Sequence, residues 1–292
     1  MIFVMYKPIF FSCFAFLFAL AVGSCNVSTD SETGITDSTK IVSTNGTLSE
    51  ILVALGFEDN IVGVDVASTY PASLQQKPKI GHNRDISAEG VLALGADLAV
   101  GIADVVKPEV TEQIRATGTK FLLFNHEYSI DGAKRLIRAV ADSLGRPAKG
   151  DSILNALEAD LARADSIVAR SASKPKVLFI YARGTGTMMV AGQGTQLDEI
   201  IELAGGVNAV QGFEDFKPLT SEALIAANPD VILLFDSGLS SLGGIDGLLQ
   251  VQGISETNAG KNRNVVEMDG QLLTGFGPRL GKAIAELAGK IH

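Results

Sequence analysis

Apolar residues follow two alternating patterns in the first half of the chain. Short apolar runs indicate buried strands, whereas stretches with an apolar residue at every third or fourth position indicate helices. The predicted strands are 41–43, 62–65, 97–101 and 120–124, and the predicted helices are 47–55, 87–95, 108–117 and 130–144. Strands and helices that alternate in this way are typical of a parallel sheet covered by helices.

The alternation returns in the second half, after one long helical stretch. Residues 147–172 carry apolar residues at helical spacing between alternating charges, and no glycine follows Gly150 in this stretch. We expect a rigid connecting helix there, about 30 Å long or longer at roughly 1.5 Å per residue. The elements predicted beyond it are strands 176–181, 188–192, 231–235 and 264–268, helices 196–204 and 221–228, a helix after Pro278, and a Gly- and Ser-rich loop at 237–247. The chain is therefore expected to be an α/β protein with one block at 41–146, a connector at 147–172 and a second block at 173–292.

One internal repeat relates the two blocks. The segment Ser-Ala-Glu at 87–89 lines up with Thr-Ser-Glu at 220–222, with an offset of 133 residues. Each copy has a hydroxyl side chain suited to cap a helix and a glutamate in the first helical turn. If the repeat is real, Glu89 and Glu222 occupy equivalent places and can meet two matched cations on a symmetric partner. The alternative is that common helix caps recur without any deeper relation.

The first 25 residues have the pattern of a processing signal. Lys7 precedes an apolar run at 9–22, which is shorter than the roughly 18 to 20 residues that cross a bilayer. The run ends in Val-Gly-Ser-Cys, a lipoprotein cleavage pattern, so Cys25 is expected to become the lipidated first residue of the mature chain. A plain secretory signal and a transmembrane helix are the alternatives. Residues 26–40 are polar and rich in Ser and Thr, which predicts a flexible tether.

Charge and motif content narrow the classes of function. The formal net charge of −9 argues against nucleic acid as a partner. The sequence has no G-x-S-x-G, H-E-x-x-H or P-loop motif, so we expect no enzyme, and a lipid-anchored hydrolase is a remote alternative. Removal of the signal also removes Cys13, and no disulfide is then expected. His82 and His126 stand apart, unlike the clustered ligands of a zinc or manganese carrier.

Candidate chemistry concentrates in residues 64–91. Tyr70 stands before Pro71, and a residue before proline favours extended backbone, so the phenol is expected to stand out from a loop. Arg84 follows in the next predicted loop. A phenol oxygen held near a guanidinium is a hard donor that can be kept anionic. Ferric iron favours such a ligand, and tyrosine is one of the axial ligands of haem. An ordinary loop tyrosine is the alternative interpretation.

With these residues in view, the chain resembles the substrate-binding components of bacterial ABC importers for haem, which are relatives of the vitamin B12 and ferric-siderophore carriers. The resemblance covers nearly all of residues 40–290. It is carried by VDVASTYP (64–71), ISAEGVLALGADL (86–98), VAGQGTQLDEIIELAGGVNA (190–209), FKPLTSEALIAANPDVIL (216–233), SLGGIDGLL (241–249) and MDGQLLTGFGPRL (268–280). It implies the class III periplasmic-binding-protein architecture, in which one long rigid helix joins two Rossmann-like lobes and the ligand lies in the cleft between them.

The resemblance also implies roles for individual residues. Tyr70 matches the axial iron ligand, and Glu89 and Glu222 match glutamates that dock onto arginines of the permease. Arg84 matches an arginine that is a candidate to hydrogen-bond the phenolate or a haem propionate. Weaker basic candidates near the cleft are Lys217 and Arg279.

The chain departs from the pattern in one loop. Some haem carriers have a second axial histidine after the first strand of the C-terminal lobe, where this chain reads Tyr-Ala-Arg-Gly at 181–184. We expect either a five-coordinate haem on Tyr70 alone or a weak sixth contact from Arg183 or Met188. Arg183 can instead pair with a propionate, and Met188 can be an ordinary core residue.

The protein expected from this resemblance is a lipid-anchored monomer at the extracytoplasmic face of a membrane. It would capture haem and deliver it to the permease and ATPase of an importer. A corrinoid or ferric-siderophore carrier of the same class is the alternative.

Overall fold

The N-terminal sheet is parallel, as the sequence predicts. The computed structural model describes residues 1–3 and 35–292, so most of the predicted signal, with Cys25, and most of the predicted tether lie outside the described residues. The sheet order is β2-β1-β5-β6, with β1 (Ile41–Ser43), β2 (Ile61–Val64), β5 (Leu98–Ile102) and β6 (Lys120–Phe124). Its helices are α1 (Gly46–Ala54), α2 (Ala88–Ala93), α3 (Pro108–Ala116) and α4 (Ile130–Ser143). A short helix, η1 (Ala72–Gln76), and a small hairpin of β3 (Gly81–His82) and β4 (Asp85–Ile86) were not predicted.

The C-terminal sheet is mixed, although the sequence shows the same alternation. Its order is β10-β8-β7-β11-β12, and β9 pairs with β7. The strands are β7 (Lys176–Ala182), β8 (Met188–Ala191), β9 (Val207–Asn208), β10 (Phe216–Pro218), β11 (Val231–Phe235) and β12 (Val265–Met268). Strand β8 runs antiparallel to β7 because only a tight Gly-rich turn joins them, and β10 is antiparallel to β8. The helices include α6 (Gln196–Leu203), α7 (Ser221–Ala227), α10 (Asn258–Asn262), α11 (Gly270–Thr274) and α12 (Leu280–Ile291), with a short helix η2 (Ile254–Glu256).

The prediction of a loop at 237–247 is wrong, because this stretch is largely helical. It contains α8 (Asp236–Ser241) and the start of α9 (Gly244–Leu249). Leu239, Leu242 and Leu248 are buried in one apolar cluster with the central strands, and this burial outweighs the poor helix propensity of Gly and Ser. Helix α9 begins at Gly244 after Gly243, and both glycines have positive φ.

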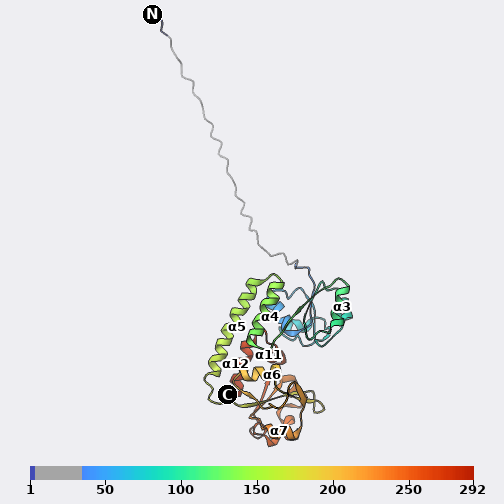
Figure 1. Cartoon of the computed structure of the whole chain (residues 1–292), viewed down its shortest axis with the longest axis vertical. Coiled ribbons are helices and arrows are strands. Elements are labelled where there is room, and N and C mark those ends of the chain that lie inside the picture. Colours follow the sequence, from blue (N-terminus) through green and yellow to red (C-terminus); the bar gives the residue numbers. More distant parts are fainter. Residues whose placement is uncertain (4–34) are drawn as a thin grey trace. The chain divides into compact units, whose positions relative to one another are not determined.

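The predicted connector is one uninterrupted helix that packs beside both sheets. Helix α5 (Pro147–Val168) has 22 residues, about 33 Å at roughly 1.5 Å per residue. It packs against α4 from the N-terminal half and against α12 from the end of the chain (Figure 1). One apolar cluster runs from β1 and α4 through α5 to α12 and β7, so a common core supports both sheets. Helices α12 and α5 approach closely at Gly281, where a Cβ would lie 2.6 Å from the backbone of Asp160.

We call the β1–β6 half the N-terminal lobe and the β7–β12 half with α12 the C-terminal lobe. The exact boundaries at 146/147 and 172/173 stay predictions. Residues 35–292 belong to one compact unit, in which the last helix packs on the connector. None of the helices in the described residues is long and apolar enough to cross a membrane.

Candidate functional site

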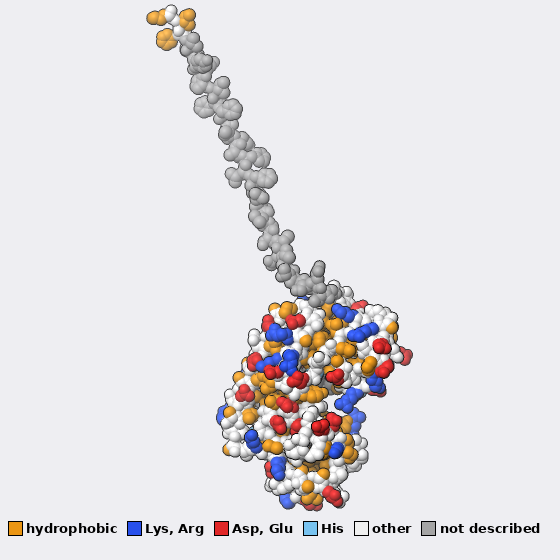
Figure 2. Space-filling view, viewed as in Figure 1, with side chains coloured by type: hydrophobic (Ala, Val, Ile, Leu, Met, Phe, Trp, Pro, Cys, Tyr) orange, Lys and Arg blue, Asp and Glu red, His pale blue; other side chains and the backbone are white. Residues whose placement is uncertain are grey.

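Polar and aromatic side chains gather where the strands of both sheets end. Tyr70 follows β2 and Tyr128 follows β6, while Tyr181 and Phe235 stand at the ends of β7 and β11. In open α/β sheets, ligands bind outside the carboxyl ends of the strands. Figure 2 shows Lys and Arg side chains beside an indentation at the right edge of the described part of the molecule. These strand ends are therefore the place to look for a ligand site.

Tyr70 stands out from its loop, as predicted. Its side chain is 43% exposed, and its peptide bond to Pro71 is cis. The guanidinium of Arg279, from the C-terminal lobe, lies 3.6 Å from the centroid of the Tyr70 ring. A cation at this distance over an aromatic face is favourable. The phenol is thus presented next to a fixed positive charge while part of it remains open to a ligand.

The N-terminal lobe anchors the Tyr70 loop through a buried polar network. The Asp65 carboxylate accepts hydrogen bonds from the Ser68 hydroxyl and from the Ala67 amide, and Ser49 lies 2.8 Å from Ser68. Burial raises the pKa of Asp65, and the Ser68 hydrogen bond opposes this shift. Lys79 donates to the carbonyls of Ser68 and Leu74 at 3.3 and 3.0 Å. Burial lowers the pKa of Lys79, partly offset by the charge of Asp65.

Arg279 is held over Tyr70 by an ion pair between the lobes. Its Nε donates to Glu50 Oε2 of α1 at 2.9 Å, and the two side chains are only 15% and 8% exposed. Burial raises the pKa of Glu50, whereas the charge and hydrogen bonds of Arg279 lower it, so burial is the larger effect. Glu50 Oε1 and Arg279 Nη2 are buried without a well-formed hydrogen bond, although Nη2 lies 2.9 Å from Oε2. The ion pair is therefore buried and close, but one polar atom of each side chain lacks a well-formed hydrogen bond.

A second aromatic group is formed by His126, Tyr128 and Phe276. The rings of His126, Tyr128 and Phe276 meet edge to face, with centroid distances of 5.2 and 5.5 Å. Burial raises the pKa of Tyr128, and the charge of Arg84 lowers it, which places Arg84 in the field of this phenol. His126 Nε2 lies 3.2 Å from the Phe276 carbonyl; burial lowers the pKa of His126, and this contact opposes the shift.

The other predicted contacts lie elsewhere on the C-terminal lobe. Arg183 is exposed and lies 5.9 Å from the Tyr181 ring, and Lys217 is exposed and lies 4.5 Å from the Phe213 ring. Met188 is half-buried and packs against the apolar cluster of the C-terminal sheet. Within residues 35–292, no hydrogen bond, ion pair or ring contact joins these three side chains to Tyr70. Of the predicted basic residues, Arg279 is the one with a described contact to the Tyr70 ring in residues 35–292.

The two repeated glutamates occupy matching positions. Glu89 and Glu222 are exposed in the first turns of α2 and α7, which Ser87 and Thr220 cap through their hydroxyls. The match extends further along the chain. The carboxylates of Asp97 and Asp230 accept from the backbone amides of Lys40 and Lys176 at 2.8 and 3.0 Å. The internal repeat found in the sequence therefore has a counterpart in three dimensions.

Sequence reasoning did not single out four residues that shape this region: Glu50, Gln271, Tyr128 and Tyr181. The two tyrosines could have been found, because each follows or ends a predicted strand. Glu50 and Gln271 carried no local signal, since their partners lie more than 200 residues away.

Two further features of the described residues bear on ligand classes. They contain no cluster of His, Cys, Asp and Glu side chains that could hold a metal ion directly.

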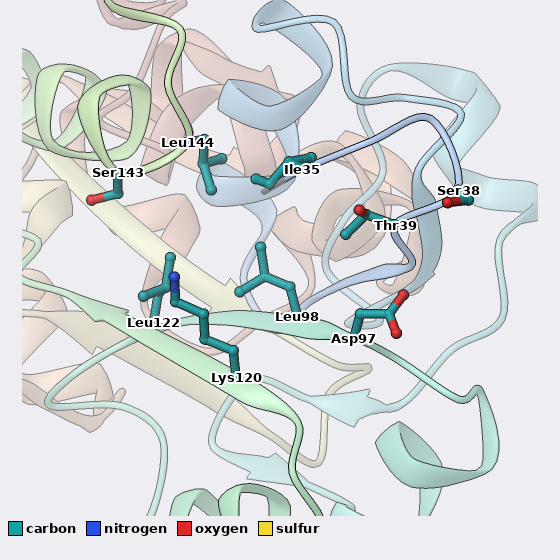
Figure 3. A pocket seen from close by; sticks show the side chains of 9 residues that line it. All are labelled: Ile35, Ser38, Thr39, Asp97, Leu98, Lys120, Leu122, Ser143 and Leu144. Atoms are coloured by element: carbon teal, nitrogen blue, oxygen red, sulfur yellow. The ribbon is translucent and has the colours of Figure 1, made fainter. Parts of the chain in front are cut away.

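A cavity of about 390 Å³ lies at the opposite end of the N-terminal sheet, where Leu98 and Lys120 begin β5 and β6 (Figure 3). Its walls include Ile35 and Leu144, so it is separate from the Tyr70 region.

Comparison with known proteins identifies the class. A model of the periplasmic binding protein family matches residues 41–272, and the chain belongs to this family. Its fold is the class III architecture of that family, whose known members are binding proteins. The chain is similar to the solved structure of the periplasmic heme-binding protein RhuT from Roseiflexus sp. RS-1. The two share 42% identity with a TM-score of 0.84, over 87% of this chain and 98% of that one.

Two curated relatives widen the comparison. One is the uncharacterized ABC transporter substrate-binding lipoprotein YvrC of Bacillus subtilis, with 28% identity over 87% of this chain and 80% of that protein. The other is a cobalamin-binding protein of Halobacterium salinarum, with 25% identity over 87% of this chain and 69% of that protein.

Proposed function

We propose that the protein is the substrate-binding component of an ABC importer and that it captures haem between its lobes. Tyr70 carries the proposal. Its phenol stands at the carboxyl end of β2, partly exposed, with a guanidinium 3.6 Å from its ring centroid. Phenolate oxygen is a hard donor that suits ferric iron, and tyrosine is a known axial ligand of haem.

The surroundings of Tyr70 suit a flat, largely apolar ligand with acidic edges. Val66 and Tyr128 are 46% and 39% exposed, and both follow strand ends of the N-terminal sheet. Large exposed apolar side chains at such a place can cover a porphyrin face. Arg84, Arg183 and Lys217 are exposed cations that can meet the propionates, since charge-assisted hydrogen bonds to carboxylates are strong.

The sixth position of the iron has one further candidate in the C-terminal lobe. Tyr181 stands at the end of β7 with Arg183 near its ring, which resembles the pairing of Tyr70 with Arg279. Met188 packs into the core and is the weaker candidate. A five-coordinate haem on Tyr70 remains the simplest arrangement.

The proposal also includes the partners expected for such a component. Glu89 and Glu222, at matching exposed helix starts, are proposed to dock onto cationic residues of the permease, whose ATPase then drives transport. Cys25 is proposed to carry the lipid that anchors the protein as a monomer at the extracytoplasmic face. The lipoprotein relative from Bacillus subtilis supports this placement.

A corrinoid is the second candidate, because the relative from Halobacterium salinarum is a cobalamin-binding protein. The two ligands make different demands on Tyr70. Cobalamin needs cleft walls but no phenolate ligand to its metal, whereas ferric haem needs an axial donor. The similarity to a heme-binding protein at 42% identity and the position of Tyr70 favour haem.

Titration of the purified protein with haemin, cobalamin and a ferric siderophore tests the proposal. Haemin should give a saturable Soret band of the tyrosinate type, and Tyr70→Ala should weaken or abolish it. Ile225→Ala is the control, since it removes a large exposed side chain from α7, which the proposal does not place at the haem. Saturable binding of cobalamin with none of haemin, or an unchanged haemin spectrum and affinity in Tyr70→Ala, would contradict the proposal.

A further inference from the structure

The side-chain oxygen of Gln271 accepts three hydrogen bonds from the Tyr70 loop. The backbone amides of Thr69 and Tyr70 donate to Gln271 Oε1 at 2.7 and 2.8 Å. The Thr69 hydroxyl donates to the same atom at 3.0 Å. One carboxamide thus binds the backbone amide of the proposed iron ligand, Tyr70, and the backbone amide of the residue before it, Thr69.

The orientation of this carboxamide is determined by its neighbours. Gln271 Nε2 donates to the Gly46 carbonyl at 3.0 Å and lies 3.5 Å from the Tyr70 carbonyl. A flipped amide would place an oxygen against two carbonyl oxygens and an NH₂ group against two amide donors. A glycine favours this close approach, because a Cβ at Gly46 would lie 3.3 Å from Gln271 Cδ and 3.2 Å from the Ala67 carbonyl.

Gln271 belongs to the C-terminal lobe, whereas all its partners belong to the N-terminal lobe. It lies in α11, directly after β12, and the Asp269 carboxylate caps this helix by accepting from the Leu272 amide at 2.7 Å. The segment that follows contacts the N-terminal lobe again. Thr47 donates to the Gly275 carbonyl at 2.6 Å, and Arg279 pairs with Glu50. The residues from Gln271 to Arg279 therefore join the two lobes at Tyr70.

We infer that Gln271 is a positioning residue for the ligand site: it fixes the Tyr70 backbone from the opposite lobe and so aims the phenol at the bound metal. The inference rests on the proposed function, because it gives the held phenol the role of iron ligand. The ring contact with Arg279 involves the Tyr70 side chain alone and makes no hydrogen bond to the backbone amides of Thr69 and Tyr70. Gln271 binds these amides from the C-terminal lobe, so the ligand geometry depends on how the two lobes are placed.

Three variants of the full chain test the inference. Gln271→Leu removes both the acceptor and the donor, Gln271→Glu keeps an acceptor oxygen for the two amides, and Gln113→Leu is the control on the exposed side of α3. Hydrogen exchange of the Thr69 and Tyr70 amides is measured first, without haem. Exchange should accelerate at least about tenfold in Gln271→Leu and not change in Gln113→Leu. It should accelerate less in Gln271→Glu, which keeps the acceptor for the two amides but sets its second oxygen against the Gly46 carbonyl.

Haemin binding by the same variants gives the second measurement. Gln271→Leu should weaken binding roughly tenfold, mainly through faster release, and should alter the tyrosinate charge-transfer band, with partial recovery in Gln271→Glu. Accelerated exchange with unchanged affinity and spectrum would overturn the positioning role, as would unchanged exchange. Failure of the wild-type protein to bind haemin, with normal protection of the two amides, would overturn the proposed function instead.

Discussion

The buried pair of Glu50 and Arg279 allows a quantitative test of how the lobes are joined. Arg279→Met removes the cation and leaves Glu50 in a site where its side chain is 8% exposed. Breaking a buried ion pair on one side costs about 3 to 5 kcal/mol. Because the Arg279 side chain is still 15% exposed, we expect the free energy of unfolding to fall by about 3 kcal/mol. This loss lowers the Tm by roughly 6 to 12 °C for a protein of this size.

Two further variants make the Arg279 test specific. The matched control is Lys107→Met, which breaks the exposed pair with Asp85, where the side chains are 57% and 85% exposed. This change should cost less than about 1 kcal/mol, since exposed pairs contribute little. Adding Glu50→Met to Arg279→Met should recover most of the loss, because no unpaired charge then remains buried. Unfolding by heat and by urea measures all four proteins. An Arg279→Met variant as stable as Lys107→Met would refute the reasoning.

Three other predictions concern pH, packing and transport. Burial lowers the pKa of His126 below 6.5, so the unfolded chain binds a proton there that the folded chain does not. The free energy of unfolding should therefore fall as the pH is lowered through 6.5, and it should fall less steeply in His126→Gln. An equal pH dependence of unfolding in the two proteins would contradict this prediction. Gly281→Ala should lower the free energy of unfolding by about 1 to 3 kcal/mol, since the new methyl group meets the α5 backbone. Gly289→Ala in the same helix has open space around the new methyl group and should not lower it. Glu89→Lys and Glu222→Lys should each reduce haem-stimulated ATPase activity of the reconstituted importer while haemin affinity is unchanged; undiminished stimulation in both would refute the docking role.

Local patterns predicted most of the fold because they act within a few residues. The strands of the N-terminal sheet, the helix caps and the long connector all follow from periodicity and cap residues. The error at 237–247 came from composition, since the Gly and Ser content there concealed two buried leucines, Leu239 and Leu242, which are three residues apart. The mixed C-terminal sheet was not predicted, although the short Gly-rich turn between β7 and β8 makes those two strands antiparallel; the direction of β10 depends on its pairing with β8.

The candidate site was only partly predictable for a related reason. Tyr70 carried a local signal, since a residue before proline favours an extended loop. Its partners Arg279 and Gln271 are more than 200 residues away, and no pattern in a single sequence specifies such contacts. Arg84 was expected to meet the phenolate or a propionate, and this stays a prediction; its described effect is to lower the pKa of Tyr128. The identity of the ligand's neighbours therefore depends on tertiary packing that the sequence does not display locally.

The most direct test of the central proposal is the absorption spectrum of the protein purified from cells supplied with haem. The wild-type protein should emerge coloured, with a Soret band and the charge-transfer band of tyrosinate bound to ferric iron. Tyr70→Phe, purified in parallel, should lack that charge-transfer band although it differs by a single oxygen atom. Identical spectra from the two proteins, or a colourless wild-type protein that also fails to bind added haemin, would contradict the proposed role of Tyr70.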